Sequence, residues 1–146
     1  MTYSEDVTRY IEEHIGLIEN HEWKEFFADA PGGCGEALYE AGIEFMEGLG
    51  YVPEYAFSSC NRLTNITIPN SVTNIDGSAF ARCTRLTSVT IPNSVISIGT
   101  YAFYGCNHIN IDFKGTKAEW TELVPDTSLI FNAAYICTCL DGVIQG

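Results

Sequence analysis

The sequence predicts an α+β protein in which N-terminal helices precede a short solenoid of repeated strands. The dipeptide Ala-Phe recurs with a 23-residue period, at Ala56-Phe57, Ala79-Phe80 and Ala102-Phe103. A cysteine follows each phenylalanine at the same spacing, at Cys60, Cys83 and Cys106. Before these repeats, the apolar residues follow helical spacing. Because a fixed period with apolar residues at constant positions is typical of a solenoid, we expect about 2.5 repeats of this length.

Two helices are expected at the start of the chain. Thr2 and Glu5 have the spacing of a capping box, and the apolar residues behind them predict a helix over 3–15 that ends near Gly16. Asn20 can cap a second, short helix. This helix would place three aromatic residues on one side: Trp23, Phe26 and Phe27. A Pro-Gly-Gly sequence then breaks the helical pattern.

A third helix is expected over residues 34–48. One apolar stripe is predicted along it, made of Leu38, Ala41, Phe45 and Leu49. An acidic stripe is predicted on another side, made of Glu36, Glu40, Glu44 and Glu47. We expect Gly48 and Gly50 to end this helix, because glycine readily adopts the left-handed conformation found at helix C-termini.

Each repeat is expected to contribute one short strand, at residues 63–68, 86–91 and 109–113. Strand alternation directs Leu63, Ile66 and Ile68 inward, and Asn65 and Thr67 outward. A proline follows each of the first two strands and ends it, because proline cannot donate to a continuing ladder.

The last repeat is one residue shorter than the others. Ile111 and Phe113 stand where the repeat period places residues 112 and 114.

The junction between helices and repeats contains no linker. Val52 stands one full repeat period before Ile75, so the third helix leads directly into the repeat register. We therefore expect a single domain, 1–146, with three parts: an acidic helical cap at 1–50, the repeats at 51–113 and a C-terminal β cap at 114–146. The C-terminal cap is expected to hold a helical turn at 118–123 and a closing strand at 135–139.

The charge of the chain is negative and unevenly placed. The formal net charge is −12, and residues 1–55 hold 13 acidic residues against only Arg9 and Lys24. This pattern argues against direct nucleic-acid binding, which needs clustered lysine and arginine. The acidic segment instead favours a protein partner with a basic surface, although a charge run is also typical of a solvated face.

The sequence also predicts a compartment. The first seven residues lack the basic region and the apolar segment of a signal peptide. No apolar run reaches the length of a membrane span. We therefore expect a cytoplasmic protein without membrane contact, in which the cysteines stay reduced.

The six cysteines allow a structural and a metal-binding interpretation. Cys60, Cys83 and Cys106 share one repeat position, which predicts a ladder of small buried side chains. Cys137 and Cys139 share one face of a strand but lack the two-residue gap typical of zinc ligands. Packing is therefore favoured over metal binding, and we expect no metal and no cofactor.

One cysteine allows a catalytic hypothesis. Cys34 lies at the predicted start of the third helix, where the pKa of a thiol can be lowered. His14 or His21 could then act as its base. The spacing of these histidines matches no hydrolase motif, so we expect no enzymatic activity.

The repeat resembles the BspA-type leucine-rich repeat. The stretch Leu-Thr-Asn-Ile-Thr-Ile-Pro-Asn-Ser-Val-Thr-Asn-Ile at 63–75 returns as Leu-Thr-Ser-Val-Thr-Ile-Pro-Asn-Ser-Val-Ile-Ser-Ile at 86–98. The resemblance covers residues 51–113, and the segments at 113–120 and 139–142 are similar to the closing part of such arrays. It implies a short leucine-rich-repeat solenoid. Many members of this family are secreted or surface adhesins, so an adhesin-like repeat fragment is one alternative for the function.

The predicted function is non-catalytic protein binding. Candidate binding residues lie on the third helix and on the outward faces of two strands: Glu36, Glu40, Glu44, Glu47, Asn65, Thr67, Ser88 and Thr90. A small repeat protein with an acidic head is typical of a dedicated inhibitor or effector. A phage or prophage protein that blocks a nucleic-acid-binding host defence nuclease would fit this charge. The alternatives are the adhesin fragment and an enzyme that uses Cys34.

Overall fold

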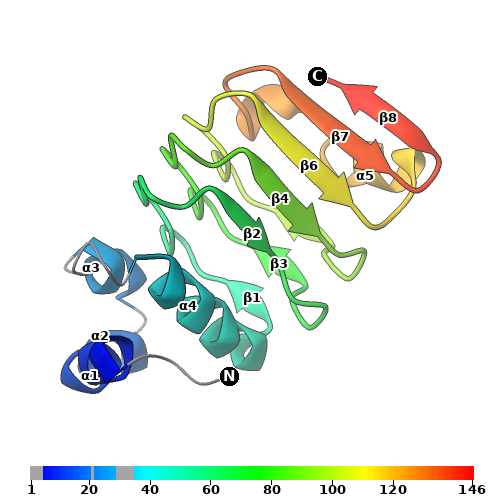
Figure 1. Ribbon diagram of the computed structural model, residues 1–146. Coiled ribbons are helices and arrows are strands. Elements are labelled where there is room, and N and C mark those ends of the chain that lie inside the picture. The colour runs from blue at the N-terminus through cyan, green and yellow to red at the C-terminus, as the bar shows by residue number, and fades with distance from the viewer. Residues whose placement is uncertain (1–4, 21, 29–34) are drawn as a thin grey trace.

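A computed structural model describes residues 5–20, 22–28 and 35–146, without the side chains of 24, 28 and 35–38. The helices are α1 (Glu5–Glu13), α2 (Ile15–Glu19), α3 (Trp23–Ala28), α4 (Gly35–Leu49), α5 (Lys117–Leu123) and the 3-10 helix η2 (Thr127–Leu129). The strands are β1 (Tyr51–Val52), β2 (Asn65–Thr67), β3 (Asn74–Ile75), β4 (Ser88–Ile91), β5 (Ser97–Ile98), β6 (Ile109–Phe113), β7 (Tyr135–Cys139) and β8 (Gly142–Gln145). Helices α1–α4 lie at one end of the stacked strands, and α5 and β8 lie at the other (Figure 1).

The strands form two sheets. One sheet has the order β1-β3-β5, and the other has the order β2-β4-β6-β7-β8. Every pair is parallel except β7 with β8. Ile66 pairs with Val89 at the full repeat offset, whereas Val89 pairs with Ile111 at an offset shorter by one. The predicted shortening of the last repeat is therefore confirmed.

A stack of aromatic rings runs through the interior from one end of the molecule to the other. Phe57, Phe80 and Phe103 lie in parallel planes, with ring centroids 5.2 and 5.3 Å apart. The stack continues beyond the repeats, because Phe27 packs on Phe57 at 4.8 Å and Phe131 packs on Phe103 at 5.5 Å. The helical segment and the C-terminal segment thus share one core with the repeats.

The first helices differ from the prediction in their ends. The expected single helix over 3–15 is two helices, and α2 continues through Gly16 instead of ending there. Asn20 is the C-cap of α2, so the prediction that it caps the following helix is wrong. Its peptide N–H bonds back to the carbonyls of Gly16 and Ile18, which commits this residue to the preceding helix. Trp23 and Phe26 are buried as expected.

Helix α4 has its predicted length but is rotated from the predicted apolar stripe. Among its described side chains, Tyr39, Ala41 and Met46 are buried, which confirms Ala41 of the predicted stripe, whereas 37% of Phe45 is exposed. Gly42 explains the rotation: a Cβ there would lie 2.6 Å from the Phe27 ring, so glycine lets α3 pack closely.

The C-terminal end of α4 is set by one glycine. Gly50 has a φ of +78°, and its N–H donates to the carbonyl of Met46. This is the left-handed ending that favours glycine. Gly48 lies inside the helix, so its predicted role in ending it is wrong.

The C-terminal segment holds two elements that the sequence pattern did not predict. Helix α5 begins with a capping box between Thr116 and Glu119, and it buries Trp120 as expected. Strand β7 has the predicted bounds. It does not close the sheet as predicted, because β8, the first of the two unpredicted elements, pairs on its far side. The second unpredicted element is the 3-10 helix η2.

Within the described ranges, no helix is long and apolar enough to cross a bilayer.

Candidate binding groove

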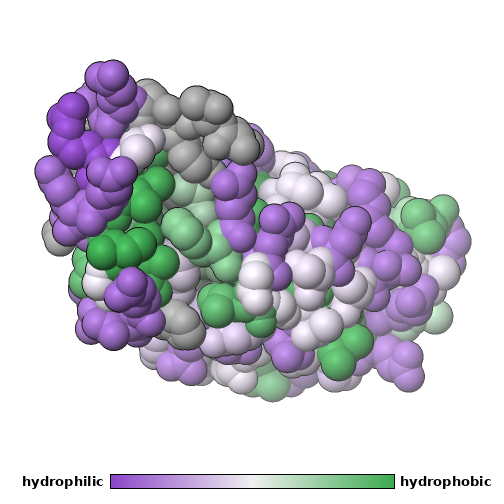
Figure 2. All heavy atoms as spheres, turned by 90° about the horizontal axis from the view of Figure 1, so that it is seen from below, coloured by the Kyte–Doolittle hydropathy of each residue, from purple (hydrophilic) through white to green (hydrophobic). Residues whose placement is uncertain are grey.

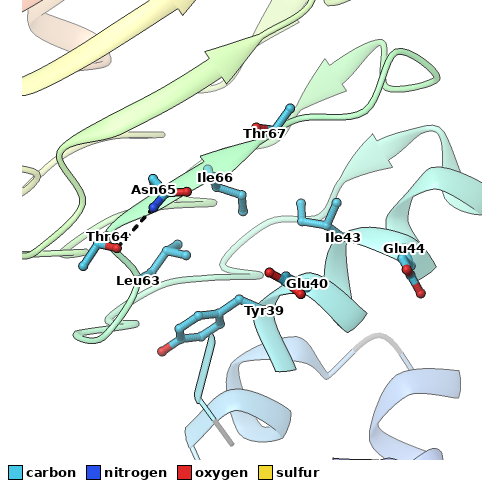
Figure 3. A pocket seen from close by; sticks show the side chains of 9 residues that line it. All are labelled: Tyr39, Glu40, Ile43, Glu44, Leu63, Thr64, Asn65, Ile66 and Thr67. Carbon is cyan, nitrogen blue, oxygen red and sulfur yellow. Dashed lines mark hydrogen bonds between the residues drawn. The ribbon is translucent and has the colours of Figure 1, made fainter. Parts of the chain in front are cut away.

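A groove of about 360 Å³ lies between helix α4 and strand β2. Nine of the described residues line it: Tyr39, Glu40, Ile43, Glu44, Leu63, Thr64, Asn65, Ile66 and Thr67. Figure 3 shows the residues of α4 on one side and those of the β2 segment on the other. Its volume lies in the range of ligand-binding clefts in proteins.

Each wall follows from the periodicity of its element. On β2, Ile66 is buried while Asn65 and Thr67 are exposed, because successive side chains of a strand point to opposite faces. On α4, Glu40 and Glu44 are one helical turn apart and therefore share one side of the helix. The groove thus combines an acidic helical wall with a polar strand wall.

A buried phenol lines the groove and contacts a buried thiol. Tyr39 is 8% exposed, and its hydroxyl lies beside the Cys60 thiol. Burial raises the pKa of the Tyr39 phenol above its ordinary value. Burial likewise raises the pKa of the Cys60 thiol to about 12. Both groups therefore stay protonated at neutral pH, and neither provides a nucleophile or a general base.

Acidic side chains cover the helical end of the molecule. Eleven of the 13 acidic residues in 1–55 have described side chains, and all of these are exposed: Glu5, Asp6, Glu12, Glu13, Glu19, Glu22, Glu25, Glu40, Glu44, Glu47 and Glu54. Figure 2 shows hydrophilic residues gathered at this end, on the left, beside hydrophobic surface. Arg9 lies 3.5 Å from Asp6 in an exposed pair. The acids stay in solvent, where they set the local potential.

The structure brings together four of the eight candidate binding residues in this one groove: Glu40, Glu44, Asn65 and Thr67. Ser88 and Thr90 lie on β4, directly beside Asn65 and Thr67 in register. They extend the same outward face of the sheet. Because a parallel sheet presents these side chains in rows, the strand candidates form a continuous surface with the groove.

Of the other two candidates, only Glu47 has a described side chain, and it is not part of the groove lining. Glu47 is exposed one turn further along α4, and its carbonyl accepts a hydrogen bond from the Ser71 hydroxyl. The side chain of Glu36 and the whole of Cys34 lie outside the described residues.

Sequence reasoning missed the apolar part of the groove, which is formed by Tyr39, Ile43 and Leu63. One signal could have found it. Ile43 stands one repeat period before Ile66, so it holds the repeat position of a strand residue although it lies in a helix.

A second hollow of about 450 Å³ lies at the turns that follow the β1, β3 and β5 strands. It is lined by Tyr55, Ser58, Ser59, Ser78, Ala81, Arg82, Tyr101 and Tyr104. Tyr55, Ser78 and Tyr101 share one repeat position, and each has a positive φ. None of the residues predicted for binding is among those that line this hollow, so the groove at β2 is the stronger candidate site.

The cysteine ladder is structural. Each of two thiols donates to a carbonyl of the preceding repeat: Cys83 to Phe57 at 3.0 Å, and Cys106 to Phe80 at 3.1 Å. Each of these carbonyls also accepts a backbone N–H, Phe57 from Cys60 and Phe80 from Cys83, so the thiol adds a second bond to a carbonyl that is already paired. Cys137 and Cys139 lie with their sulfur atoms 3.7 Å apart and are free thiols. In the described ranges, no three potential ligands group into a metal site.

We expect six free thiols when the protein, purified without reductant, is unfolded and titrated with a thiol reagent. In the native state, modification of the five described cysteines should be slow, because all five are buried. The measurement is the absorbance released by the reagent before and after denaturation. A count of four or fewer in the unfolded protein would show a disulfide and contradict the prediction.

Comparison with known proteins identifies the repeats. A protein-family model described as "BspA type Leucine rich repeat region (6 copies)" matches residues 42–122, more than half of the chain. The match begins inside α4, where the repeat register places Ile43. Searches of curated proteins and of solved structures found no match to the chain.

Proposed function

The chain belongs to the BspA-type leucine-rich repeat family, and from this premise we propose that it is a non-catalytic protein-interaction module. Leucine-rich repeats generally mediate contacts between proteins, and repeat arrays present extended surfaces suited to that role. We propose that residues 1–146 act as a single domain. In it, about 2.5 repeats at 51–113 form a short solenoid between a helical cap at 1–50 and a C-terminal cap at 114–146.

The observation that carries this proposal is the joining of acids and strand residues in one groove. Glu40 and Glu44 face the same space as Asn65 and Thr67. A partner that contacts the strands there also meets the negative potential of the helical end. Charge complementarity speeds encounter and selects partners of opposite sign. The partner in this proposal is therefore a protein with a basic surface.

Such a partner matches an inhibitor or effector role inside the cell. Proteins that bind nucleic acid carry clustered lysine and arginine, and an acidic domain can cover that cluster. A host defence nuclease is one partner of this kind. The acidic domain itself would then be a compact, phage-encoded inhibitor. The protonated Cys60 thiol and Tyr39 phenol support binding rather than catalysis at this site.

The test neutralises the acidic stripe of α4 without changing its shape. The variant replaces the four glutamates of the stripe with glutamine: Glu36, Glu40, Glu44 and Glu47. Exposed carboxylates add little stability, so the variant should fold. Binding to a protein captured from the native host should become slower, with an on-rate reduced by roughly tenfold or more at low salt. DNA or RNA should compete with the module for that partner.

A matched control carries the same change in charge at the far helices. It replaces Glu12, Glu13, Glu19 and Glu22 with glutamine, and all four are exposed outside the groove. This control should keep more of the on-rate than the α4 variant does, because its substitutions lie farther from the groove. If the α4 variant binds as fast as the unaltered protein at low salt, the acids are only a solvated face and the acidic-surface proposal fails.

A further inference from the structure

Strand β2 is an open edge of the larger sheet. The sheet has the order β2-β4-β6-β7-β8, so β2 pairs with β4 on one side only. The other edge, β8, is a hairpin strand whose neighbour α5 lies against it. An edge strand is a template for pairing with another extended chain. Of the two edges, only β2 borders the groove.

The peptide groups of β2 that face the groove can be assigned from the bonds to β4. The N–H of Ile68 donates to the carbonyl of Thr90, and the carbonyl of Thr64 accepts from Thr87. Alternate residues of a strand direct their peptide groups to opposite sides. The N–H and C=O groups of Asn65 and Thr67 therefore point away from β4, toward α4.

The repeat register explains why this edge is open. The strand of a preceding repeat would occupy residues 42–44, which stand one repeat period before Asn65–Thr67. These residues lie in α4 instead. A helix has all its backbone bonds inside itself and cannot pair with a strand. The groove between α4 and β2 is thus the place that a strand would fill.

The charge around this edge selects the occupant. Glu40 and Glu44 line the groove from α4, and both are exposed. A second copy of this chain is disfavoured, because it would bring a net charge of −12 to an acidic groove. A basic segment instead finds carboxylates, and lysine or arginine can reach them on long apolar stems.

We propose that an extended, lysine- or arginine-rich segment of a protein partner adds to the edge of β2 as a further strand, beside Glu40 and Glu44. This inference rests on the proposed function and names the chemistry of the partner at the groove. Backbone bonds to Asn65 and Thr67 supply affinity, as in other cases of strand addition. Side chains on the inner face of the added strand pack near Ile43 and Ile66.

The probe is a fluorescent eight-residue peptide of alternating lysine and valine with blocked ends. Its binding to the full chain is measured by fluorescence anisotropy at low salt. The key variant is Thr67→Pro, which removes the N–H directed into the groove and keeps the bond from Ile68 to Thr90. Affinity should fall about tenfold or more. Thr67→Val removes the hydroxyl but keeps the N–H, so its affinity should fall less than that of Thr67→Pro.

Two further experiments separate the contribution of backbone pairing to peptide binding from the contribution of charge. A peptide with the same side chains but N-methyl groups on alternate amides keeps its charge and loses strand donors, so it should bind at least about tenfold more weakly. Glu40→Gln with Glu44→Gln should also weaken the peptide, while Glu12→Gln with Glu13→Gln should not. The methylated peptide tests the idea even if Thr67→Pro fails to fold.

The outcomes distinguish the two proposals. Strand addition is overturned if the unaltered chain does not bind the peptide. It is also overturned if both the Thr67→Pro variant and the methylated peptide bind at full strength. If, in that last case, the Glu40→Gln and Glu44→Gln change still weakens binding, the acidic surface stands as the binding site. If neither the loss of strand donors nor the Glu40→Gln and Glu44→Gln change weakens binding, both proposals fail.

Discussion

Replacement of Phe80 by alanine is expected to cost about 3–5 kcal/mol of unfolding free energy. The ring is completely buried and lies between Phe57 and Phe103, almost parallel to both. Alanine would remove the contacts on both sides and leave a cavity between neighbouring repeats, which the backbone bond from Phe80 to Ala102 prevents from closing. Equilibrium unfolding in urea, followed by circular dichroism, measures the loss.

The matched control for this substitution is Tyr104→Ala. Tyr104 is an aromatic residue of the following repeat, next to Phe103, but 41% of it is exposed. Its truncation should change the unfolding free energy by roughly 0.5 kcal/mol or less. Because small domains have a total stability of about 5–15 kcal/mol, the Phe80 variant should lose a large share of its stability. A loss below about 1 kcal/mol for Phe80→Ala would contradict the role of the ring stack.

The repeats were predictable because one repeated phenylalanine position fixes both the repeat period and the strand register. The spacing of Phe57, Phe80 and Phe103 gives the period, and the same period sets the strand register. Even the shortened repeat could be read from Ile111 and Phe113, because a one-residue slip would turn apolar side chains toward solvent. Periodic burial leaves little freedom, so the strand register agrees with the prediction. The prediction of one strand per repeat is wrong, because β1, β3 and β5 form a second sheet.

The ends of the molecule were harder to predict, because their partners come from elsewhere in the chain. Phe131 continues the ring stack, but the repeat period would place the next ring at Asp126. The carbonyl of Ile130 accepts from the Phe103 N–H, so this segment takes the place of another repeat. The rotation of α4 likewise depends on Phe27 meeting Gly42. Such contacts are set by tertiary packing and leave no local pattern.

The candidate groove was predictable in its polar residues only. Exposed strand positions identify Asn65 and Thr67, and the helical acid pattern identifies Glu40 and Glu44. That the two sets would meet depends on where α4 lies beside β2, and spacing within each element does not contain this information. Whether these residues bind a partner stays a prediction that the variants above can test.

Gly99→Ala is expected to destabilise the fold by about 3 kcal/mol or more. A Cβ at this position would lie 2.4 Å from the backbone nitrogen of Gly77 and 2.8 Å from the carbonyl carbon of Asp76. The N–H of Gly99 also donates to the carbonyl of Ile75 at 2.7 Å, so the two repeats touch backbone to backbone. Backbone atoms cannot rotate aside as a side chain can, so the neighbouring repeats must separate.

Gly16→Ala is the control, because it adds the same methyl group where nothing lies within 4 Å. Gly16 is part of α2, and alanine should stabilise the helix there by roughly 0.5–1 kcal/mol. Thermal unfolding should therefore move in opposite directions for the two variants. A Gly99→Ala protein that melts at the temperature of the unaltered chain would show that the repeats are not held in backbone contact. The ring stack alone would then have to set the spacing of the repeats.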